Sequence, residues 1–508
     1  MSELPNPLIP GFNPDPSCVR VDGVYYLVTS TFEYLPALPV YRSMDFVTWE
    51  HIGNVATRPE QVRIARSADA AGVWAPTIRH HDGRFHVIVS IVDSPRGCVV
   101  FTADDPAGPW SDGVTLDGIV GIDPDLAWDE DGAAYVTYST LELDGVRWVG
   151  FHGIRQARVD LAAGKTLEEP RSLWSGVGMV APEAPHLYRR DGHWYLLIAE
   201  GGTEHGHAVS VARGPSIEGP FEPAPHNPVL RGAGFAHGTE RVGHADLVEG
   251  PDGTDLMVVL GTRYAGAASP LGRETYVTEV TWADGWPQPA PVRLNPRHEP
   301  VDEYFDFTAG ARITDPGWLA VGRLPADLVT SGGPRGRLTL IATHADGGID
   351  TFRPTFVGRR QRHLNCTFET GVEPGSGRGG LGLRFDEDFT IALTAEHAPS
   401  GDGTRVTAQA RIPSLDRSWS VDVPDTRVLL RLRTLPPAPA GAPWLSGGDR
   451  ILLSVVDGGG TEHLLAELDG RFWSVENAAT FTGRVVGVFA EQGTVSFADF
   501  RYRGEGGS

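Results

Sequence analysis

The sequence predicts an all-β chain in which a five-bladed β-propeller is followed by a β-sandwich. Two observations predict the propeller: a turn motif recurs at a nearly constant interval, and a second motif precedes each turn. A third observation predicts the sandwich, because strand patterns continue beyond a proline-rich segment without either motif. We therefore assign residues 1–300 to the propeller domain and residues 301–508 to the sandwich domain.

The recurring turn is an Asp-Gly pair that is followed by an apolar or aromatic strand. Successive pairs are 60, 49, 60 and 61 residues apart and begin at Asp22, Asp82, Asp131, Asp191 and Asp252. An Asp-Gly pair between two strands favours a tight hairpin turn. Repeats of this length, each a small antiparallel sheet, are typical of propeller blades. The alternative is a sandwich whose hairpins fall at similar spacing by chance.

The second motif begins seven or eight residues before the aspartate of each turn. Its leading residues are Asp15, Trp74, Asp123, Glu183 and His244. Equivalent positions of successive blades surround the propeller axis at one end, so we expect these five side chains to meet in one pocket. Carboxylates brought close together repel one another, which indicates a functional rather than a purely structural site.

The second half of the chain begins with a linker at Pro287, which opens a segment rich in proline. After it, apolar and polar residues alternate again, for example in residues 404–412 and 427–433. About 200 residues of such short strands predict a β-sandwich of the jelly-roll or concanavalin-like kind.

Composition excludes several classes of function. The net charge of −22 and the lack of a basic stripe argue against a nucleic-acid partner. Cys18, Cys98 and Cys366 are too few and too widely spaced for a disulfide framework or a metal cluster. The first residues have neither the basic nor the apolar region of a signal peptide, and no run approaches 18 apolar residues. We expect a soluble, cytoplasmic protein with no membrane partner.

Two carboxyl groups on opposite sides of a pocket are what hydrolysis of a glycosidic bond requires. One must be protonated to assist the leaving oxygen, and the other must be ionised to activate water or to attack the sugar. A third carboxylate beside the acid raises its pKa by repulsion. Asp15, Asp123 and Glu183 supply such a trio, each from a different repeat.

These residues lie in motifs that resemble glycoside hydrolase family 43. The matching stretches are NPLIPGFNPDPS (6–17), YYLVTSTFE (25–33), GVWAP (72–76), GIDP (121–124), EAPHLY (183–188), GHADLVE (243–249), LGTR (260–263) and LGRET (271–275). They occur in order across the whole predicted propeller. The predicted sandwich is similar to the C-terminal domain of the β-xylosidase and α-L-arabinofuranosidase branch, notably at RPTFVGRRQ (353–361).

The resemblance implies that Asp15 is the general base, that Glu183 is the general acid, and that Asp123 tunes and orients Glu183. It also implies inversion of the anomeric configuration, for which the carboxyls of Asp15 and Glu183 should stand ~6.5–9.5 Å apart. Asp125 follows Asp123 on the same face of a strand and could be confused with it. A turn-forming or surface role is the alternative for each carboxylate.

The resemblance also implies residues that bind the sugar. Trp74 and Phe32 would line the pocket, with an ordinary core aromatic as the alternative for each. Arg263 would reach the sugar hydroxyls, with a buried salt bridge as the alternative, while Arg273 and Glu274 are expected to form a structural ion pair. His244 would hold water at the axis.

No metal or other cofactor is expected. Relatives carry either water or a Ca²⁺ ion beside the residue equivalent to His244, and without a cluster of carboxylates we favour a structural or water-binding histidine.

The predicted function is an exo-acting, inverting β-xylosidase that releases D-xylose from the non-reducing ends of short oligosaccharides. An α-L-arabinofuranosidase, or one enzyme with both activities, is the alternative. A carbohydrate-binding propeller without activity is disfavoured because all three carboxylates are present. A retaining, sucrose-type hydrolase is disfavoured because its Arg-Asp-Pro and Glu-Cys pairs are replaced at Ile122 and Ala184. Relatives with this sandwich imply a dimer or tetramer.

Overall fold

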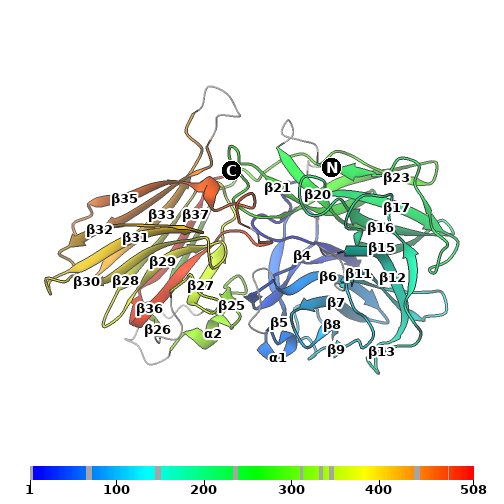
Figure 1. Ribbon diagram of the computed structural model, residues 1–508, viewed down its shortest axis with the longest axis horizontal. Coiled ribbons are helices and arrows are strands. Elements are labelled where there is room, and N and C mark those ends of the chain that lie inside the picture. The colour runs from blue at the N-terminus through cyan, green and yellow to red at the C-terminus, as the bar shows by residue number, and fades with distance from the viewer. Residues whose placement is uncertain are drawn as a thin grey trace.

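The computed structural model describes residues 4–64, 71–142, 150–232, 238–308, 313–330, 336–342, 348–439, 447–478 and 480–507. In Figure 1 the chain forms two β domains that lie beside each other. The described helices are α1 (Pro59–Val62), α2 (Pro325–Leu328) and the 3₁₀ turn η3 (Gly470–Phe472). The all-β prediction is confirmed, and none of these helices is long and apolar enough to cross a membrane.

The first domain is a propeller of five antiparallel sheets, as predicted. The first two blades are β1 (Ser17–Val21), β2 (Val24–Val28), β4 (Ala37–Ser43), β5 (Glu50–Ala56), and β6 (Gly72–His81), β7 (Arg84–Val92), β8 (Gly97–Ala103), β9 (Val114–Thr115). The third is β10 (Ile122–Trp128), β11 (Ala134–Glu142), β12 (Gly150–Asp160), β13 (Lys165–Thr166), β14 (Arg171–Trp174). The last two are β15 (Glu183–Arg190), β16 (His193–Glu200), β17 (Ala208–Gly214), β18 (Glu222–Pro223), β19 (Leu230–Arg231), and β20 (Thr239–Glu249), β21 (Asp255–Arg263), β22 (Glu274–Ala283), β23 (Trp286–Pro289).

The blades close into a ring around their innermost strands. Strand β1 contacts β6, β6 contacts β10, β10 contacts β15, β15 contacts β20, and β20 returns to β1. The N-terminal segment ties the last blade to the first, because the Leu8 amide donates to the Thr275 carbonyl at 2.7 Å. Each Asp-Gly pair lies between the first two strands of its blade, and in three of them both residues have the positive φ of a tight hairpin turn.

The second domain is a sandwich whose two sheets share the long strand β36 (Val485–Phe497). One sheet contains β27 (Thr355–Arg360), β29 (Arg378–Arg384), β30 (Thr390–His397), β31 (Thr404–Ile412) and β32 (Leu415–Val423). The other contains β24 (Val301–Asp306), β26 (Leu338–Ala342), β28 (Cys366–Glu373), β33 (Val428–Leu435), β34 (Arg450–Val456), β35 (Glu462–Asp469) and β37 (Asp499–Gly504).

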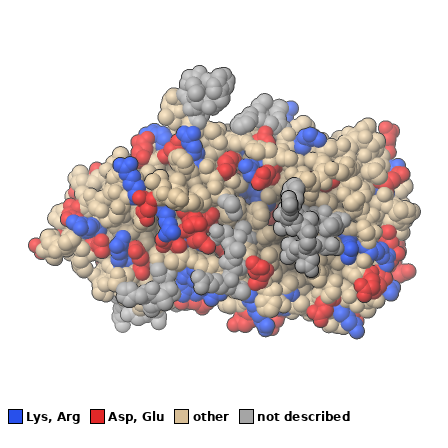
Figure 2. Space-filling view, viewed as in Figure 1, with Lys and Arg blue, Asp and Glu red and all other residues tan. Residues whose placement is uncertain are grey.

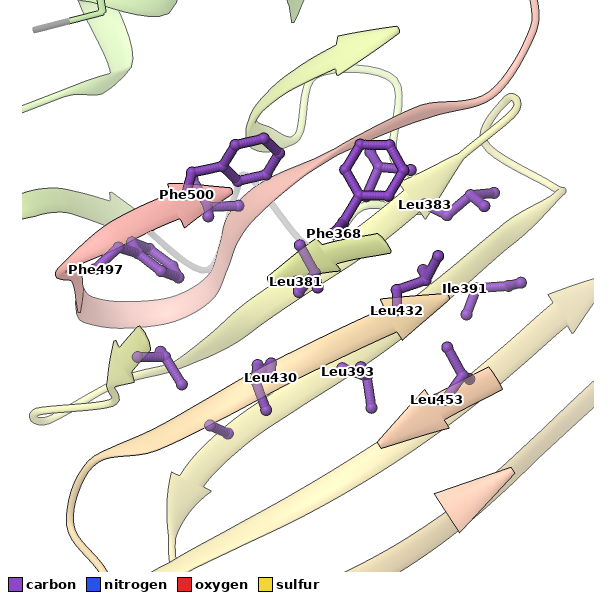
Figure 3. Close-up of a cluster of buried hydrophobic side chains, with 14 of the residues drawn as sticks. Phe368, Leu381, Leu383, Ile391, Leu393, Leu430, Leu432, Leu453, Phe497 and Phe500 are labelled. Atoms are coloured by element: carbon purple, nitrogen blue, oxygen red, sulfur yellow. The ribbon is translucent and has the colours of Figure 1, made fainter. Parts of the chain in front are cut away.

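Alternating side chains of these sheets fill the sandwich core. Figure 3 shows Phe368, Leu381, Leu430, Phe497 and Phe500 in this core, and all five side chains are fully buried. Strands β31 and β33 alternate between buried and partly exposed residues, which is the pattern of strands with one face toward the core. The predicted sandwich is confirmed.

The two domains are joined by backbone pairing as well as by packing. Strand β25 (Ala320–Val321) pairs with β3 (Tyr34–Leu35), which lies in the chain between β2 and β4 of the first blade. Phe12 and Phe32 of the propeller pack in one cluster with Phe356 and Phe489 of the sandwich. The sandwich is therefore held against the segment that carries Phe32. On the face shown in Figure 2, acidic and basic side chains are interspersed and form no continuous basic stripe.

Candidate active site

A small pocket brings together residues from all five blades and one residue from the sandwich. Its lining consists of Asp15, Phe32, Trp74, Ala75, Ile122, Asp123, Glu183, Thr203, His207, His244, Leu260, Arg273 and Phe481. All five residues predicted to converge are therefore in it. Its volume is about 60 Å³, so the pocket is small.

In each blade a residue with left-handed backbone shapes this pocket, two residues before the innermost strand in the first blade and within that strand in the other four. These residues are Asp15, Ala75, Asp123, Ala184 and His244, with φ of 56°, 45°, 54°, 51° and 50°. In the last four blades the strand pairing shifts register at the same point, so each strand bulges there. In two blades the residue that we aligned with Asp15, Asp123 and His244 is therefore one position too early. Trp74 and Glu183 each directly precede the left-handed residue, which is Ala75 or Ala184.

Asp15 is surrounded by hydrogen-bond donors and by the positive charge of Arg273. The Ser30 hydroxyl donates to Asp15 Oδ2 at 2.5 Å. On the other oxygen, Arg273 Nη1 and His244 Nδ1 each lie 3.4 Å from Asp15 Oδ1. The carboxyl is almost fully buried. An ionised carboxylate held in this way can accept a proton from a water molecule, as a general base must.

Glu183 and Asp123 form a pair that retains a proton. Burial, and then the charges of Asp123 and Asp15, raise the pKa of Glu183 well above its usual range, and Arg273 opposes this rise. Burial, and then Asp15, raise the pKa of Asp123 to about 7. The Ala184 amide donates to Asp123 Oδ2 at 3.1 Å and stabilises negative charge there. The proton therefore belongs on Glu183, which can act as an acid near neutral pH.

Three aromatic rings form one side of the pocket. The rings of Trp74 and Phe481 are 5.2 Å apart and nearly perpendicular, and those of Phe32 and Phe481 are 5.8 Å apart. Trp74 and Phe32 lie where the resemblance implied. Phe481 was not predicted, because it lies in a segment of the sandwich between η3 and β36 that has no recognisable motif.

The expected role of Arg263 is wrong in this structure. Its guanidinium forms a buried, two-point ion pair with Glu274, at 2.9 and 3.2 Å, and donates to the Arg362 carbonyl. The arginine in the pocket is Arg273, so the expected Arg273–Glu274 ion pair is also wrong. Neighbouring residues on an extended chain point in opposite directions, and this alternation could have shown that Arg273 and Glu274 face different surroundings.

Arg273 connects three parts of the pocket. Its Nη1 donates to the Thr203 hydroxyl at 2.9 Å and lies 3.4 Å from Asp15 Oδ1. Its Nη2 donates to the Phe481 carbonyl at 3.4 Å, and the guanidinium lies 5.0 Å from the centre of the Phe481 ring. This arginine therefore links the proposed base to blade four and to the sandwich.

The histidines of the pocket are neutral. Burial lowers the pKa of His244 to about 3 and that of His207 to about 4. His207, in the loop just before β17, also lines this pocket, and the sequence did not predict it there. The surroundings of His244 do not fit a Ca²⁺ ion, because they offer ring nitrogens, Arg273 and a single carboxylate rather than a shell of oxygens. In the described part of the chain no group of three or more His, Cys, Asp or Glu could hold a metal ion.

Asp125 belongs to a separate, buried network. Arg79 Nη2 donates to Asp125 Oδ1 at 2.7 Å, and Arg79 Nη1 donates to Asp246 Oδ2 at 3.1 Å. The Leu187 amide donates to Asp125 Oδ2 at 3.0 Å. The left-handed turn at Asp123 separates the two aspartates, so Asp123 lines the pocket while Asp125 holds the inner strands together.

Two family models cover most of the chain. Residues 4–287 match the model of glycosyl hydrolases family 43. Residues 311–503 match the model of the beta xylosidase C-terminal Concanavalin A-like domain.

Curated proteins and solved structures give concordant matches. A xylosidase/arabinosidase of Butyrivibrio fibrisolvens is 41% identical over 288 residues, which span 56% of this chain and 55% of that protein. The non-reducing end alpha-L-arabinofuranosidase BoGH43B of Bacteroides ovatus is 42% identical over 391 residues, 72% of this chain and 70% of that protein. The crystal structure of a xylan beta-1,4-xylosidase from Bacillus halodurans C-125 has a TM-score of 0.87 at 27% identity and covers 99% of this chain and 100% of that chain.

Proposed function

The chain belongs to glycosyl hydrolases family 43, and we propose that it is an exo-acting, inverting β-D-xylosidase. Its substrates would be short xylo-oligosaccharides, from whose non-reducing ends it removes single xylose units. The observation that carries this proposal is the trio of carboxyls in one small pocket. Glu183 is protonated beside Asp123, and Asp15 is held by hydrogen-bond donors.

In the proposed reaction the two carboxyls act in a single displacement. Glu183 gives its proton to the glycosidic oxygen as the bond from that oxygen to the anomeric carbon breaks. Asp15 takes a proton from a water molecule whose oxygen attacks the same carbon from the opposite face. The negative charge of Asp123 raises the pKa of Glu183, so Glu183 stays protonated until the glycosidic bond breaks. Arg273 holds Asp15 in place.

The pocket favours attack at a chain end. Phe481 of the sandwich completes a wall with Trp74 and Phe32, so side chains from both domains close one side of the pocket. An apolar ring face suits the CH groups of a sugar, and the charged groups on the other sides suit its hydroxyls. A long polymer would need a groove open at both ends.

An α-L-arabinofuranosidase is the second candidate, alone or as a second activity of the same pocket. The name of the Bacteroides ovatus relative favours it, whereas the names of several other relatives favour xylose. Rates on nitrophenyl β-D-xyloside and nitrophenyl α-L-arabinofuranoside, measured side by side, distinguish the two. We expect the xyloside to have the higher kcat/KM. A preference for the arabinofuranoside would reverse the assignment, and no hydrolysis of either would overturn it.

We also propose that the protein is a cytoplasmic homo-oligomer, either a dimer or a tetramer. Imported oligosaccharides would then be degraded to single sugars inside the cell. Light scattering during gel filtration tests the oligomeric state, and a monomer at micromolar concentration would contradict it.

A further inference from the structure

Phe481 contributes to the pocket in two ways. Its ring packs edge to face against Trp74, with 5.2 Å between centroids, and also against Phe32. Its carbonyl accepts a hydrogen bond from Arg273 Nη2 at 3.4 Å. A shift of the Phe481 backbone would therefore move the aromatic wall and disturb the arginine that holds Asp15.

The backbone around Phe481 fits tightly against the backbone that precedes Arg273. A Cβ atom on Gly272 would lie 2.6 Å from the Thr482 carbonyl oxygen. A Cβ atom on Gly483 would lie 2.3 Å from the Leu271 carbonyl oxygen. Only glycine permits this approach at either position, so the segment that carries Phe481 and the segment that carries Arg273 are expected to move together.

The Phe481 segment is anchored inside the sandwich by a buried ion pair. Arg484 Nη1 lies 2.5 Å from Asp449 Oδ2, and Arg484 Nη2 lies 2.9 Å from Asp449 Oδ1. The two side chains are 0% and 1% exposed. Arg484 also donates to the carbonyls of Trp473 and Gly470, at 2.9 and 2.7 Å. A two-point pair between a guanidinium and a carboxylate fixes orientation as well as distance.

A second contact anchors the same segment nearer to the pocket. The Thr482 hydroxyl donates to the Phe385 carbonyl at 2.8 Å, beyond the end of strand β29. Two independent attachments to the sandwich therefore lie one and three residues from Phe481. Neither Thr482 nor Arg484 is among the residues that line the pocket.

We infer that Asp449 and Arg484 are positioning residues for the reaction, because they set the places of Phe481 and Arg273 through this anchored segment. The inference rests on the proposed function and deepens it. It gives the sandwich domain a specific part in binding the terminal sugar. Loss of the ion pair should loosen the sugar-binding wall while Glu183 and Asp123 keep their own contacts in the propeller.

The variant Asp449→Asn tests this inference in the full-length protein. It keeps the size of the side chain but removes its charge. We expect KM on the substrate that the wild-type enzyme hydrolyses to rise about tenfold or more, with kcat changed far less. Arg484→Lys should give a smaller rise in KM, because lysine keeps the charge without the two-point geometry. An unchanged KM in a folded Asp449→Asn protein would overturn the inference.

Thr482→Val is a second, milder test, since it removes one hydroxyl with little change of shape. It should also raise KM, and it decides the question if Asp449→Asn does not fold. The matched control is Arg431→Met, which breaks the Arg431–Glu369 ion pair, 2.6 Å apart, elsewhere in the sandwich. The control should lower the melting temperature without raising KM. Equal KM changes in Thr482→Val and the control would overturn the inference, whereas an inactive wild-type enzyme would instead contradict the proposed function.

Discussion

Replacing Asp123 by asparagine should make the protein more stable at neutral pH and less active. Burial and Asp15 raise the pKa of Asp123 from 3.8 to about 7. The folded state therefore holds a proton that the unfolded state has released, and stability falls as pH rises from about 4 through about 7. A rise of the pKa from 3.8 to about 7 lowers the free energy of unfolding at high pH by about 4 kcal/mol at most. Asparagine does not ionise, so it removes this loss of stability. Its side-chain oxygen can still accept the hydrogen bond from the Ala184 amide.

Thermal unfolding at pH 4 and at pH 8 measures this effect. We expect Asp123→Asn to melt above the wild-type protein at pH 8 and close to it at pH 4. The matched control is Asp125→Asn, since Asp125 is also buried but is paired with Arg79. The control should melt below the wild-type protein at pH 8, because a buried charge pair loses one partner. A lower melting temperature for Asp123→Asn at pH 8, or equal shifts in the two variants, would refute the reasoning.

The remaining predictions concern activity. Glu183→Ala should lose about 10²–10⁴-fold in kcat on xylobiose and little on a dinitrophenyl xyloside, whose leaving group needs no proton; equal losses on both would exclude Glu183 as the acid. Wild-type activity should fall at high pH as Glu183 loses its proton. In Asp123→Asn this fall should occur at lower pH, because the negative charge of Asp123 no longer raises the pKa of Glu183. Arg273→Met should lower kcat/KM with little change in melting temperature. Arg263→Met should instead destabilise the protein by about 3–5 kcal/mol, because Glu274 is left buried without its partner, and a kinetic defect in a fully stable Arg263→Met protein would contradict this division.

The architecture, and the meeting of three carboxyl side chains in one pocket, could be predicted from the sequence for a physical reason. A propeller repeats one unit, so Asp-Gly hairpins and the motif before them recur at a spacing that can be measured along the chain. The convergence of Asp15, Asp123 and Glu183 follows from that repetition alone, without any knowledge of side-chain contacts.

The same repetition could not show which residue of each motif turns toward the axis. In two blades the left-handed residue is Ala75 or Ala184, one position after the residue that the motif alignment had placed there. The left-handed conformation occurs at a local bulge, which cannot be recognised from the pattern of residue types. Arg263 and Arg273 have the same chemistry and lie in adjacent motifs. Only their positions relative to Glu274 and Asp15 assign one to the core and the other to the pocket.

Phe481 could not be predicted, since it reaches the pocket from the other domain. No repeat relates it to the blades, and its position depends on contacts between Gly272 and Thr482 that exist only in the folded chain. The part that the sandwich plays in the pocket is therefore a property of tertiary structure.

The central claim is that Asp15 and Glu183 cleave the bond in a single displacement. Proton NMR of the sugar released from a β-D-xyloside, recorded before mutarotation, tests it most directly. The account predicts that α-D-xylose appears first and that the β anomer grows in only as the sugar equilibrates. If β-D-xylose appears first, the configuration is retained, one carboxylate has attacked the sugar, and the assignment of Asp15 as a base is contradicted.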